Sequence, residues 1–293
     1  MKPPPFRYHD PATVAEALDI LATMENAKLL AGGQSLMPML NMRYVQPDHI
    51  VDLNKIAELA YVADEGQVIR IGAMTRQREL EFSATIRDRL PLMHDALMNV
   101  GHRQTRNRGT IGGSLCHLDP AAELVAVATA YDAVVTVRGK AGPRDVPFAE
   151  FPAGFMMPAT EPDEIVTTIA FEPWPAGHGA AFLEFSRRRG DFAVASVAVL
   201  LDCDRDTIRR ASVTIGGLSH APQRARAAED ILRHSPAAPD RFQAAAEACG
   251  ALDAGGDIHA STSYRQRLAR VLSHRALLIA HERARAAQTG RSA

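Results

Sequence analysis

Lys28–Met39, KLLAGGQSLMPM, joins a short apolar stretch to a helix-like one through a glycine pair and small polar residues. A second glycine pair lies in Arg108–Ser114, RGTIGGS, between an irregular basic stretch and another helix-like one. Glycine permits positive φ and lets backbone N–H groups approach a ligand without a Cβ in the way. Two such loops that face each other would form a concave set of N–H donors suited to a diphosphate. A diphosphate site is therefore the main functional hypothesis.

Neither loop follows the commonest nucleotide-binding patterns. There is no G-x-x-x-x-G-K and no G-x-G-x-x-G, which disfavours nucleoside-triphosphate hydrolysis and an ordinary dinucleotide site. A plain turn without a ligand is the alternative for each loop. Side chains that could add donors to the amides are Gln34, Ser35, Thr110 and Ser114. The arginines before the second loop could offset phosphate charge or form a solvated surface: Arg103, Arg106 and Arg108.

The composition is that of an ordinary globular protein of 293 residues, with 46% hydrophobic residues, 23% charged residues and a formal net charge of −1. The length predicts two or three domains, and the charge balance disfavours a general nucleic-acid binder. The arginine-rich stretch 262–287 has no aromatic platform, so a solvated face or a partner contact is expected there. No signal-peptide core and no membrane-spanning run are present, which predicts a cytoplasmic protein.

Three cysteines, Cys116, Cys203 and Cys249, lie far apart, and none belongs to a C-x-x-C pair. Iron–sulfur clusters use four thiolates and structural zinc sites use clustered cysteines or histidines, so this chain alone should hold neither. The histidines show no metal-ligand spacing either. We expect buried, reduced thiols and no metal ligands, and we assign no catalytic residue.

Apolar periodicity predicts an α+β fold in three parts, 1–58, 59–176 and 177–293. In the first part, Asp10 is the expected N-cap of a helix that continues to Leu21, and two parallel strands, 28–31 and 49–53, flank a helix over 36–42. The second part has predicted strands over 61–63, 68–71, 133–137 and 165–171, predicted helices over 76–83, 90–100 and 121–130, and an irregular basic stretch over 101–109. After a linker over 172–177, we expect antiparallel strands over 181–186, 196–201 and 208–215, then helices over 223–232, 241–249 and 262–287.

The two glycine loops also resemble motifs of a known family. Lys28–Met39 is similar to the A-G-G-[HQ]-S-L-x-P segment of the medium, flavin-carrying subunits of molybdenum hydroxylases, of the carbon monoxide dehydrogenase and xanthine dehydrogenase type. Arg108–Ser114 resembles their T-I-G-G-N motif, with Ser114 where the family commonly has Asn. Ile71–Thr75 (IGAMT), Arg187–Ala193 (RRRGDFA) and Ile215–Leu218 (IGGL) have counterparts too. The resemblance runs from Tyr8 to about Ala280.

The resemblance implies a two-part FAD-binding domain of the PCMH, vanillyl-alcohol-oxidase-like type and a C-terminal α+β domain with a three-stranded antiparallel sheet and helices. It places the diphosphate of FAD between the two loops, with Asp119 and Glu123 towards the ribityl chain and ring. Arg188, Asp191 and Phe192 would approach the isoalloxazine. The implied cofactor residues are Lys28, Leu29, Leu30, Ala31, Gly32, Gly33, Gln34, Ser35, Leu36, Thr110, Ile111, Gly112, Gly113, Ser114, Asp119, Glu123, Arg188 and Asp191.

The function implied is electron transfer by FAD in a heteromeric molybdenum hydroxylase. The partners would be a large subunit with the molybdenum cofactor and a small subunit with [2Fe-2S] clusters, in a dimer of heterotrimers. Carbon monoxide, an aldehyde, a purine or another N-heterocycle could be the substrate, and a quinone, a cytochrome, NAD or oxygen the acceptor. The alternatives are a self-sufficient flavin oxidoreductase and a non-catalytic assembly subunit.

Overall fold

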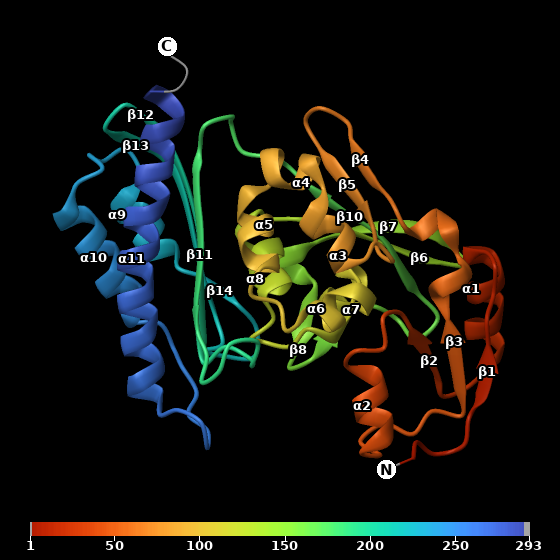
Figure 1. Ribbon diagram of the computed structural model, residues 1–293. Helices are drawn as coiled ribbons and strands as arrows, with labels where there is room; N and C mark the ends of the chain where they lie inside the picture. Colours follow the sequence, from red (N-terminus) through yellow and green to blue (C-terminus); the bar gives the residue numbers. More distant parts are fainter. Residues whose placement is uncertain (1, 290–293) are drawn as a thin grey trace. The chain divides into compact units, whose positions relative to one another are not determined.

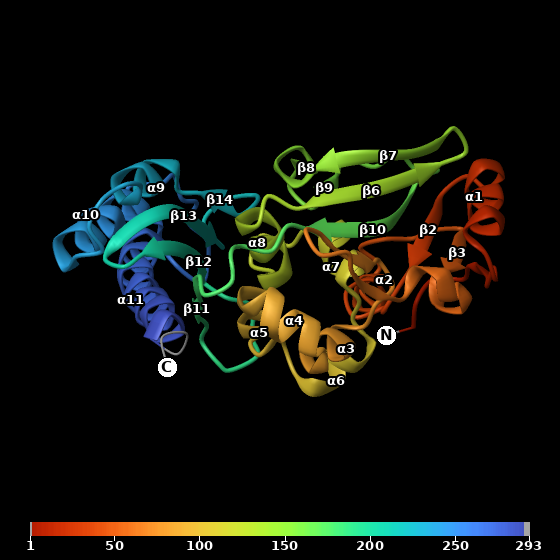
Figure 2. The same ribbon diagram turned by 90° about the horizontal axis from the view of Figure 1, so that it is seen from above.

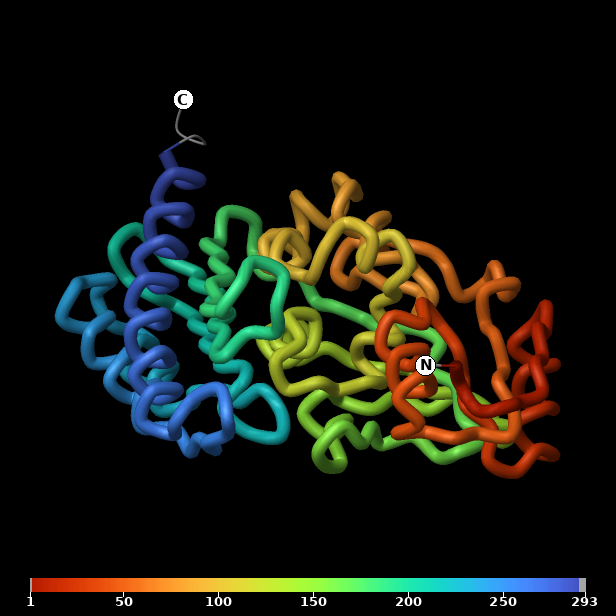
Figure 3. Tube along the Cα trace, turned by 60° about the horizontal axis from the view of Figure 1, so that its bottom comes forward, coloured from red at the N-terminus to blue at the C-terminus, as the bar shows by residue number. Residues whose placement is uncertain are grey.

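The computed structural model describes residues 2–289. They group into two compact units that do not follow the chain order. The first unit holds residues 2–80, 102–117 and 133–171, and the second holds 81–101, 118–132 and 172–289. Two segments from the middle of the sequence therefore belong to the same unit as the C-terminal third (Figure 1, Figure 3).

A small parallel sheet opens the first unit, in the order β1 (Arg7–His9), β3 (His49–Asp52) and β2 (Ala27–Leu30). The predicted parallel arrangement of the two apolar strands is confirmed, and β1 is an additional strand. Helix α1 (Val14–Thr23) buries side chains at helical spacing, namely Val14, Ala17, Leu18 and Leu21. They pack with the strands into one apolar core.

The start of α1 differs from the prediction. Thr13 is the N-cap, and its Oγ1 accepts the N–H of Glu16 at 3.2 Å. Asp10, the predicted cap, instead forms an ion pair with Lys55. Threonine caps a helix by the same side-chain acceptor chemistry as aspartate, so the helix begins after Thr13 and the predicted cap at Asp10 is wrong.

The second sheet of the first unit is antiparallel and five-stranded, in the order β4–β5–β10–β6–β7. Figure 2 shows β10, β6 and β7 side by side. Its strands are β4 (Val62–Asp64), β5 (Ile69–Gly72), β10 (Ile165–Phe171), β6 (Val134–Gly139) and β7 (Gly142–Pro147). Ile169 stands opposite Ile71 on one side and Val135 on the other, and all three side chains are buried. The central strand thus brings together segments that are far apart in the sequence.

Short helices and turns connect these strands. They are α2 (Leu36–Asn41), η1 (Leu53–Lys55), η2 (Ala57–Leu59), α3 (Gln77–Phe82), α4 (Ala84–Arg89), α5 (Pro91–Leu97), α6 (Arg103–Arg108), α7 (Ile111–His117), α8 (Glu123–Ala130) and η3 (Phe148–Glu150), with a small hairpin of β8 (Pro152–Gly154) and β9 (Met157–Pro158). The basic stretch predicted to be irregular contains α6, which corrects that prediction. The helix expected over 90–100 is shorter, because Pro91 begins α5 and Met98 ends it.

The second unit is built on an antiparallel sheet in the order β11 (Gly179–Phe185), β12 (Ala195–Asp204), β13 (Thr207–Gly216) and β14 (Gln223–Arg224). One face is covered by α9 (Arg226–Leu232), α10 (Pro239–Gly250) and α11 (Thr262–Thr289) (Figure 2). The other face packs against α5 and α8. The three predicted strands are confirmed, but the predicted three-stranded sheet has a fourth strand, β14, at its edge. The helix expected from Gln223 begins only at Arg226, because Gln223 and Arg224 pair with β13.

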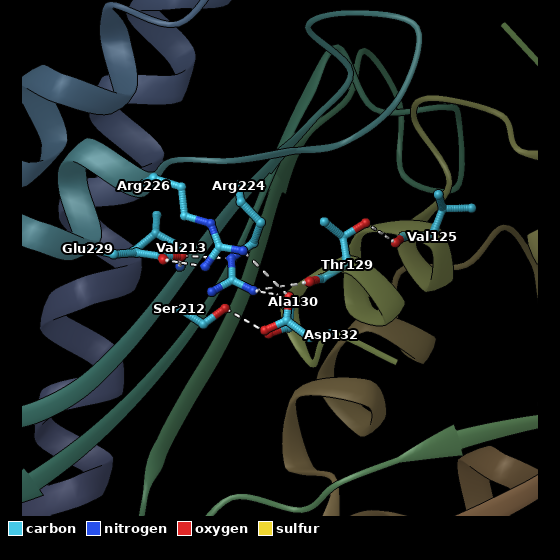
Figure 4. Close-up of polar contacts among 9 residues, drawn as sticks. All are labelled: Val125, Thr129, Ala130, Asp132, Ser212, Val213, Arg224, Arg226 and Glu229. Atoms are coloured by element: carbon cyan, nitrogen blue, oxygen red, sulfur yellow. Dashed lines mark hydrogen bonds and ion pairs between the residues drawn. The ribbon is translucent and has the colours of Figure 1, made fainter. Parts of the chain in front are cut away.

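A buried ion-pair network ties α9 to this sheet (Figure 4). The side chain of Glu229 is 1% exposed, and its Oε1 accepts the N–H of Val213 at 2.9 Å and Nε of Arg224 at 2.7 Å. Arg226 donates to Oε2 of Glu229 at 3.2 Å. Arg224 also donates to Oδ1 of Asp132 at 2.7 Å, which extends the network to the end of α8. Each buried charge therefore depends on its partners.

No helix among residues 2–289 combines the length and the apolar character needed to cross a membrane.

Candidate functional site

The first glycine loop is a tight bend between β2 and α2. Gly33 has φ +73°, a left-handed conformation that favours glycine. Its carbonyl accepts the N–H of Met37 at 3.2 Å, and Nε2 of Gln34 donates to the carbonyl of Gly32 at 3.1 Å. These hydrogen bonds use the carbonyls of the bend and leave its N–H groups unused.

Three consecutive amides of this bend have no partner in the described part of the chain. No residue in 2–289 accepts a hydrogen bond from the N–H of Gly33, Gln34 or Ser35. Gln34 is exposed and its two neighbours are half-buried, so the bend reaches the surface. Adjacent unbonded N–H groups in a turn before a helix form an anion-binding concavity.

The second glycine segment packs directly against the first. A Cβ at Gly32 would lie 2.2 Å from the carbonyl oxygen of Arg108 and 2.8 Å from Cα of Gly109. A Cβ at Gly113 would lie 3.3 Å from Cβ of Ala31. Glycine at position 32 is therefore required by the close approach of another backbone segment. The two glycine segments are neighbours in space, as the residue pattern predicted. Gly112 and Gly113, however, lie in α7 rather than in the predicted loop.

The amides of the second segment, however, are already bonded within the protein. The N–H of Ile111 donates to the carbonyl of Thr75 at 3.2 Å, and that of Gly112 to the carbonyl of Ala73 at 2.9 Å. The N–H of Gly113 donates to Oγ1 of Thr110 at 3.0 Å. The prediction of a nest with amides from both loops is wrong for these three groups. The second segment braces the first, and the unbonded N–H groups come from the first loop.

The remaining predicted residues of these loops differ in exposure. Lys28 is exposed on β2, whereas Leu29, Leu30, Leu36 and Ser114 are half-buried. Two polar residues that the sequence analysis did not single out, Asn54 and Arg76, bridge the two loops. They belong to no motif, so only the structure identifies them.

Asp119 and Glu123, which the resemblance places near the ribityl chain and the flavin ring, belong to the second unit. Asp119 lies just before α8, and Glu123 begins it. Oδ1 of Asp119 accepts the N–H of Ala121 at 2.8 Å and fixes the turn before the helix. Glu123 is the first residue of α8, which corrects the predicted helix start at 121. An acidic residue in the first turn of a helix is favoured by the helix dipole.

The other predicted flavin-side residues lie on the loop between β11 and β12, also in the second unit. The carbonyl of Arg188 accepts the N–H of Asp191 at 3.0 Å and the hydroxyl of Ser186 at 2.8 Å. The side chains of Arg188 and Asp191 are exposed, and Phe192 is 70% exposed. The loop has internal order and presents an aromatic ring and two charges to the surface.

Arg265 of α11 holds the end of this loop. Its Nη1 donates to the carbonyls of Val194 at 2.6 Å and Gly217 at 2.5 Å, and its Nη2 to Asp257 at 2.6 Å. Gly217 in turn donates its N–H to the carbonyl of Pro120 at 2.9 Å. One guanidinium thus joins the β11–β12 loop, the end of β13 and the segment before α11.

Asp257 should make the stability of the chain depend on pH. The N–H groups of His259 and Ala260, together with Arg265, lower the pKa of Asp257 from its ordinary 3.8 to about 2. The stabilisation is therefore present above the ordinary pKa and is lost as the pH falls through about 2. We expect the native protein to unfold at a higher urea concentration than the Asp257→Asn variant near neutral pH. This difference between the two midpoints should disappear in acid. A difference that stays constant with pH would contradict this assignment.

The cysteines show no sign of reactivity. Cys203 and Cys249 are buried and Cys116 is half-buried. Burial raises the pKa of Cys116 to about 12 and that of Cys203 and Cys249 to about 11, so the thiols stay protonated. Within residues 2–289, no group of three or more His, Cys, Asp or Glu side chains is placed to hold a metal ion.

Comparisons with known proteins match nearly the whole chain. Residues 4–174 match the family model of the FAD binding domain in molybdopterin dehydrogenase, and residues 180–280 that of the CO dehydrogenase flavoprotein C-terminal domain. The chain is 40% identical to the 6-hydroxypseudooxynicotine dehydrogenase complex subunit alpha of Paenarthrobacter nicotinovorans, over 97% of each chain. It is 34% identical to the carbon monoxide dehydrogenase medium chain of Hydrogenophaga pseudoflava, over 94% of this chain and 97% of the relative.

Solved structures agree with these relationships. A carbon monoxide dehydrogenase chain from Hydrogenophaga pseudoflava superposes with a TM-score of 0.94 at 36% identity, covering 97% of this chain and 99% of the other. A quinoline 2-oxidoreductase chain from Pseudomonas putida 86 gives a TM-score of 0.93 at 32% identity, covering 97% and 99%. The fold and these comparisons thus define an FAD-binding flavoprotein. The chain belongs to the medium subunits of the molybdenum hydroxylase family, and it is an oxidoreductase subunit.

Proposed function

We propose that this chain holds FAD and relays electrons from iron–sulfur clusters of a small partner subunit to an external acceptor. Substrate is oxidised on a large partner subunit with the molybdenum cofactor, in a cytoplasmic dimer of heterotrimers. The observation that carries the proposal is the row of unbonded amides, Gly33–Ser35, on a bend with the family's glycine motif. FAD, once bound, exchanges electrons singly or in pairs. It can therefore connect iron–sulfur clusters, which carry one electron at a time, to other acceptors.

The residues of the first loop fit the diphosphate of FAD. The consecutive N–H groups of the bend can each donate to a phosphate oxygen, and no acceptor among residues 2–289 competes for them. Gly32 lets the backbone of Arg108 and Gly109 approach closely, which holds the bend in place. The loop is therefore preorganised, and an anion would gain charge-assisted hydrogen bonds at little conformational cost.

We assign the cofactor residues as the resemblance implies, with one change of role. Lys28–Leu36 contacts the diphosphate, while Thr110–Ser114 acts mainly by supporting that loop, since three of its amides are used internally. Asp119, Glu123, Arg188 and Asp191 serve the ribityl chain and the flavin ring. The protein's part is to hold the ring and to leave an edge open to the incoming cluster and to the acceptor.

We also propose the division 1–58, 59–176 and 177–293 as functional parts. Each part contains its own sheet, namely the three-stranded parallel sheet, the five-stranded sheet and the four-stranded sheet. In this proposal the first part presents the diphosphate loop and the second part braces it. The third carries the β11–β12 loop with Phe192.

Purification of the full chain tests the proposal. The purified protein should be yellow, with flavin absorption at about 450 nm, and protein from which FAD has been removed should recover this colour when FAD is added. Alone it should oxidise no substrate, and with both partner subunits it should support reduction of an acceptor. Protein that takes up no FAD would contradict the proposal. Substrate turnover by the single chain would instead favour a self-sufficient flavin enzyme, and acceptor reduction by an FAD-free complex would favour an assembly role.

A further inference from the structure

Asn54 connects the carbonyl just before the first glycine pair to the rest of the first unit. Its Nδ2 donates to the carbonyl of Ala31 at 3.0 Å, and its own N–H donates to Oδ1 of Asp52 at 2.9 Å. Asp52 ends β3, the central strand of the parallel sheet. The position of the glycine bend is therefore tied to the sheet through one amide side chain.

Arg76 extends this link to the second glycine segment. One Nη of Arg76 donates to Oδ1 of Asn54, and the other donates to the carbonyl of Arg108. That carbonyl is the group seated against Gly32. Because a guanidinium is a rigid planar fork, two bonds in fixed directions set the separation of the two loops. Lysine could not make both bonds with the same geometry.

The same place carries positive charge without a paired carboxylate. Neither Arg76 nor Arg108 forms an ion pair with any residue of the described chain. Burial and the neighbouring charge of Arg108 both lower the pKa of Arg76, whereas Glu79 and Asp52 oppose this more weakly. Arg76 contacts the second glycine segment directly and is linked through Asn54 to the carbonyl of Ala31, just before the first glycine pair. An anion bound at the first glycine loop would therefore be stabilised by these two positive charges.

We propose that Arg76, held by Asn54, supplies the positive charge opposite the diphosphate of FAD and fixes the first glycine loop in its binding geometry. This inference rests on the proposed binding of FAD at that loop. Asn54 acts as a positioning residue, because its donor is used on Ala31 and its acceptor on Arg76. Arg76 combines both roles, since the N–H donors left over from its two bonds are free to meet a phosphate.

Titration of apoprotein with FAD at several salt concentrations tests the two roles separately. Arg76→Gln should weaken FAD binding by about 10- to 100-fold and flatten its salt dependence, because a charge-assisted contact is lost. Arg76→Lys should retain the salt dependence and lose about 10-fold, since the charge remains without the fork. Asn54→Ala should also lose about 10-fold with unchanged salt dependence. Inorganic pyrophosphate should compete with FAD in the native chain and less well in Arg76→Gln.

Arg138→Gln is the matched control, because it removes one exposed positive charge from β6 of the same unit. It should bind FAD like the native chain. Thermal unfolding of each apoprotein shows whether a variant has lost its fold. FAD binding by Arg76→Gln equal to that of Arg138→Gln would overturn the inference while leaving the proposed function intact. Equal salt and pyrophosphate responses in Arg76→Gln and the native chain would also overturn it. If the native chain itself takes up no FAD, the proposed function fails first.

Discussion

The Gly32→Ala variant is expected to purify without FAD, with an affinity at least about 100-fold below that of the native chain. Its Cβ would lie 2.2 Å from the carbonyl oxygen of Arg108, well inside van der Waals contact. The opposing atoms belong to the backbone and cannot rotate away, so the two loops must separate. The amides of Gly33–Ser35 would move with the first loop. Titration of the apoprotein with FAD measures the loss.

Gly154→Ala provides the control for an added methyl group in the same unit. The nearest atom to its Cβ would be Sδ of Met157 at 3.5 Å, an ordinary contact with a flexible side chain. This variant should retain FAD and melt at the native temperature. Native-like FAD affinity in Gly32→Ala would show that the first loop does not depend on its contact with Arg108, and the assigned site would be wrong.

Glu229→Ala is expected to destabilise the chain by about 3–5 kcal/mol, because it removes the carboxylate from a buried ion pair. Arg224, whose side chain is 11% exposed, would keep only Asp132 as an acidic partner. The N–H of Val213 would also lose its acceptor inside the protein. Urea unfolding, followed by far-UV circular dichroism, measures the change in the free energy of unfolding.

Asp230→Ala tests whether the effect belongs to the network or to α9 in general. Its side chain is 69% exposed and lies 3.8 Å from Arg233, so its removal should change the free energy of unfolding by less than about 0.5 kcal/mol. Equal effects of the two substitutions would show that the buried network contributes nothing beyond helix propensity.

Elements with a clear apolar pattern could be predicted from the sequence. The strand expected over 165–171 has the same bounds in the structure, because its apolar run lies between polar turns. The missed elements lack such a pattern. β7 buries only Val146, and α6 buries only Arg106, so their pairing partners and neighbours, rather than periodicity, determine them. β1 has no fully buried residue and is held by pairing with β3.

The site was predictable in part for a related reason. Glycine pairs at element junctions are visible in residue types alone, and their contact is confirmed. Which amides remain unbonded depends on the carbonyls of Ala73 and Thr75, which approach from a distant bend. Asn54 and Arg76 belong to no recognisable motif. Their role is visible only in the folded chain, where they connect the carbonyls of Ala31 and Arg108. Residue types therefore identified the first glycine loop, whereas contacts between distant segments determine which of the N–H groups are available to a ligand.

The interleaved path of the chain limits how its gene can be divided or recombined. Helices α5 and α8 are encoded before the linker, yet they cover one face of the four-stranded sheet that is encoded after it. A cut at the linker would expose that face, including Leu200, to water. The C-terminal third is therefore not an independently folding domain that can be transferred alone. Chimaeras between relatives should preserve solubility when 81–101 and 118–132 come from the same parent as residues 172–289.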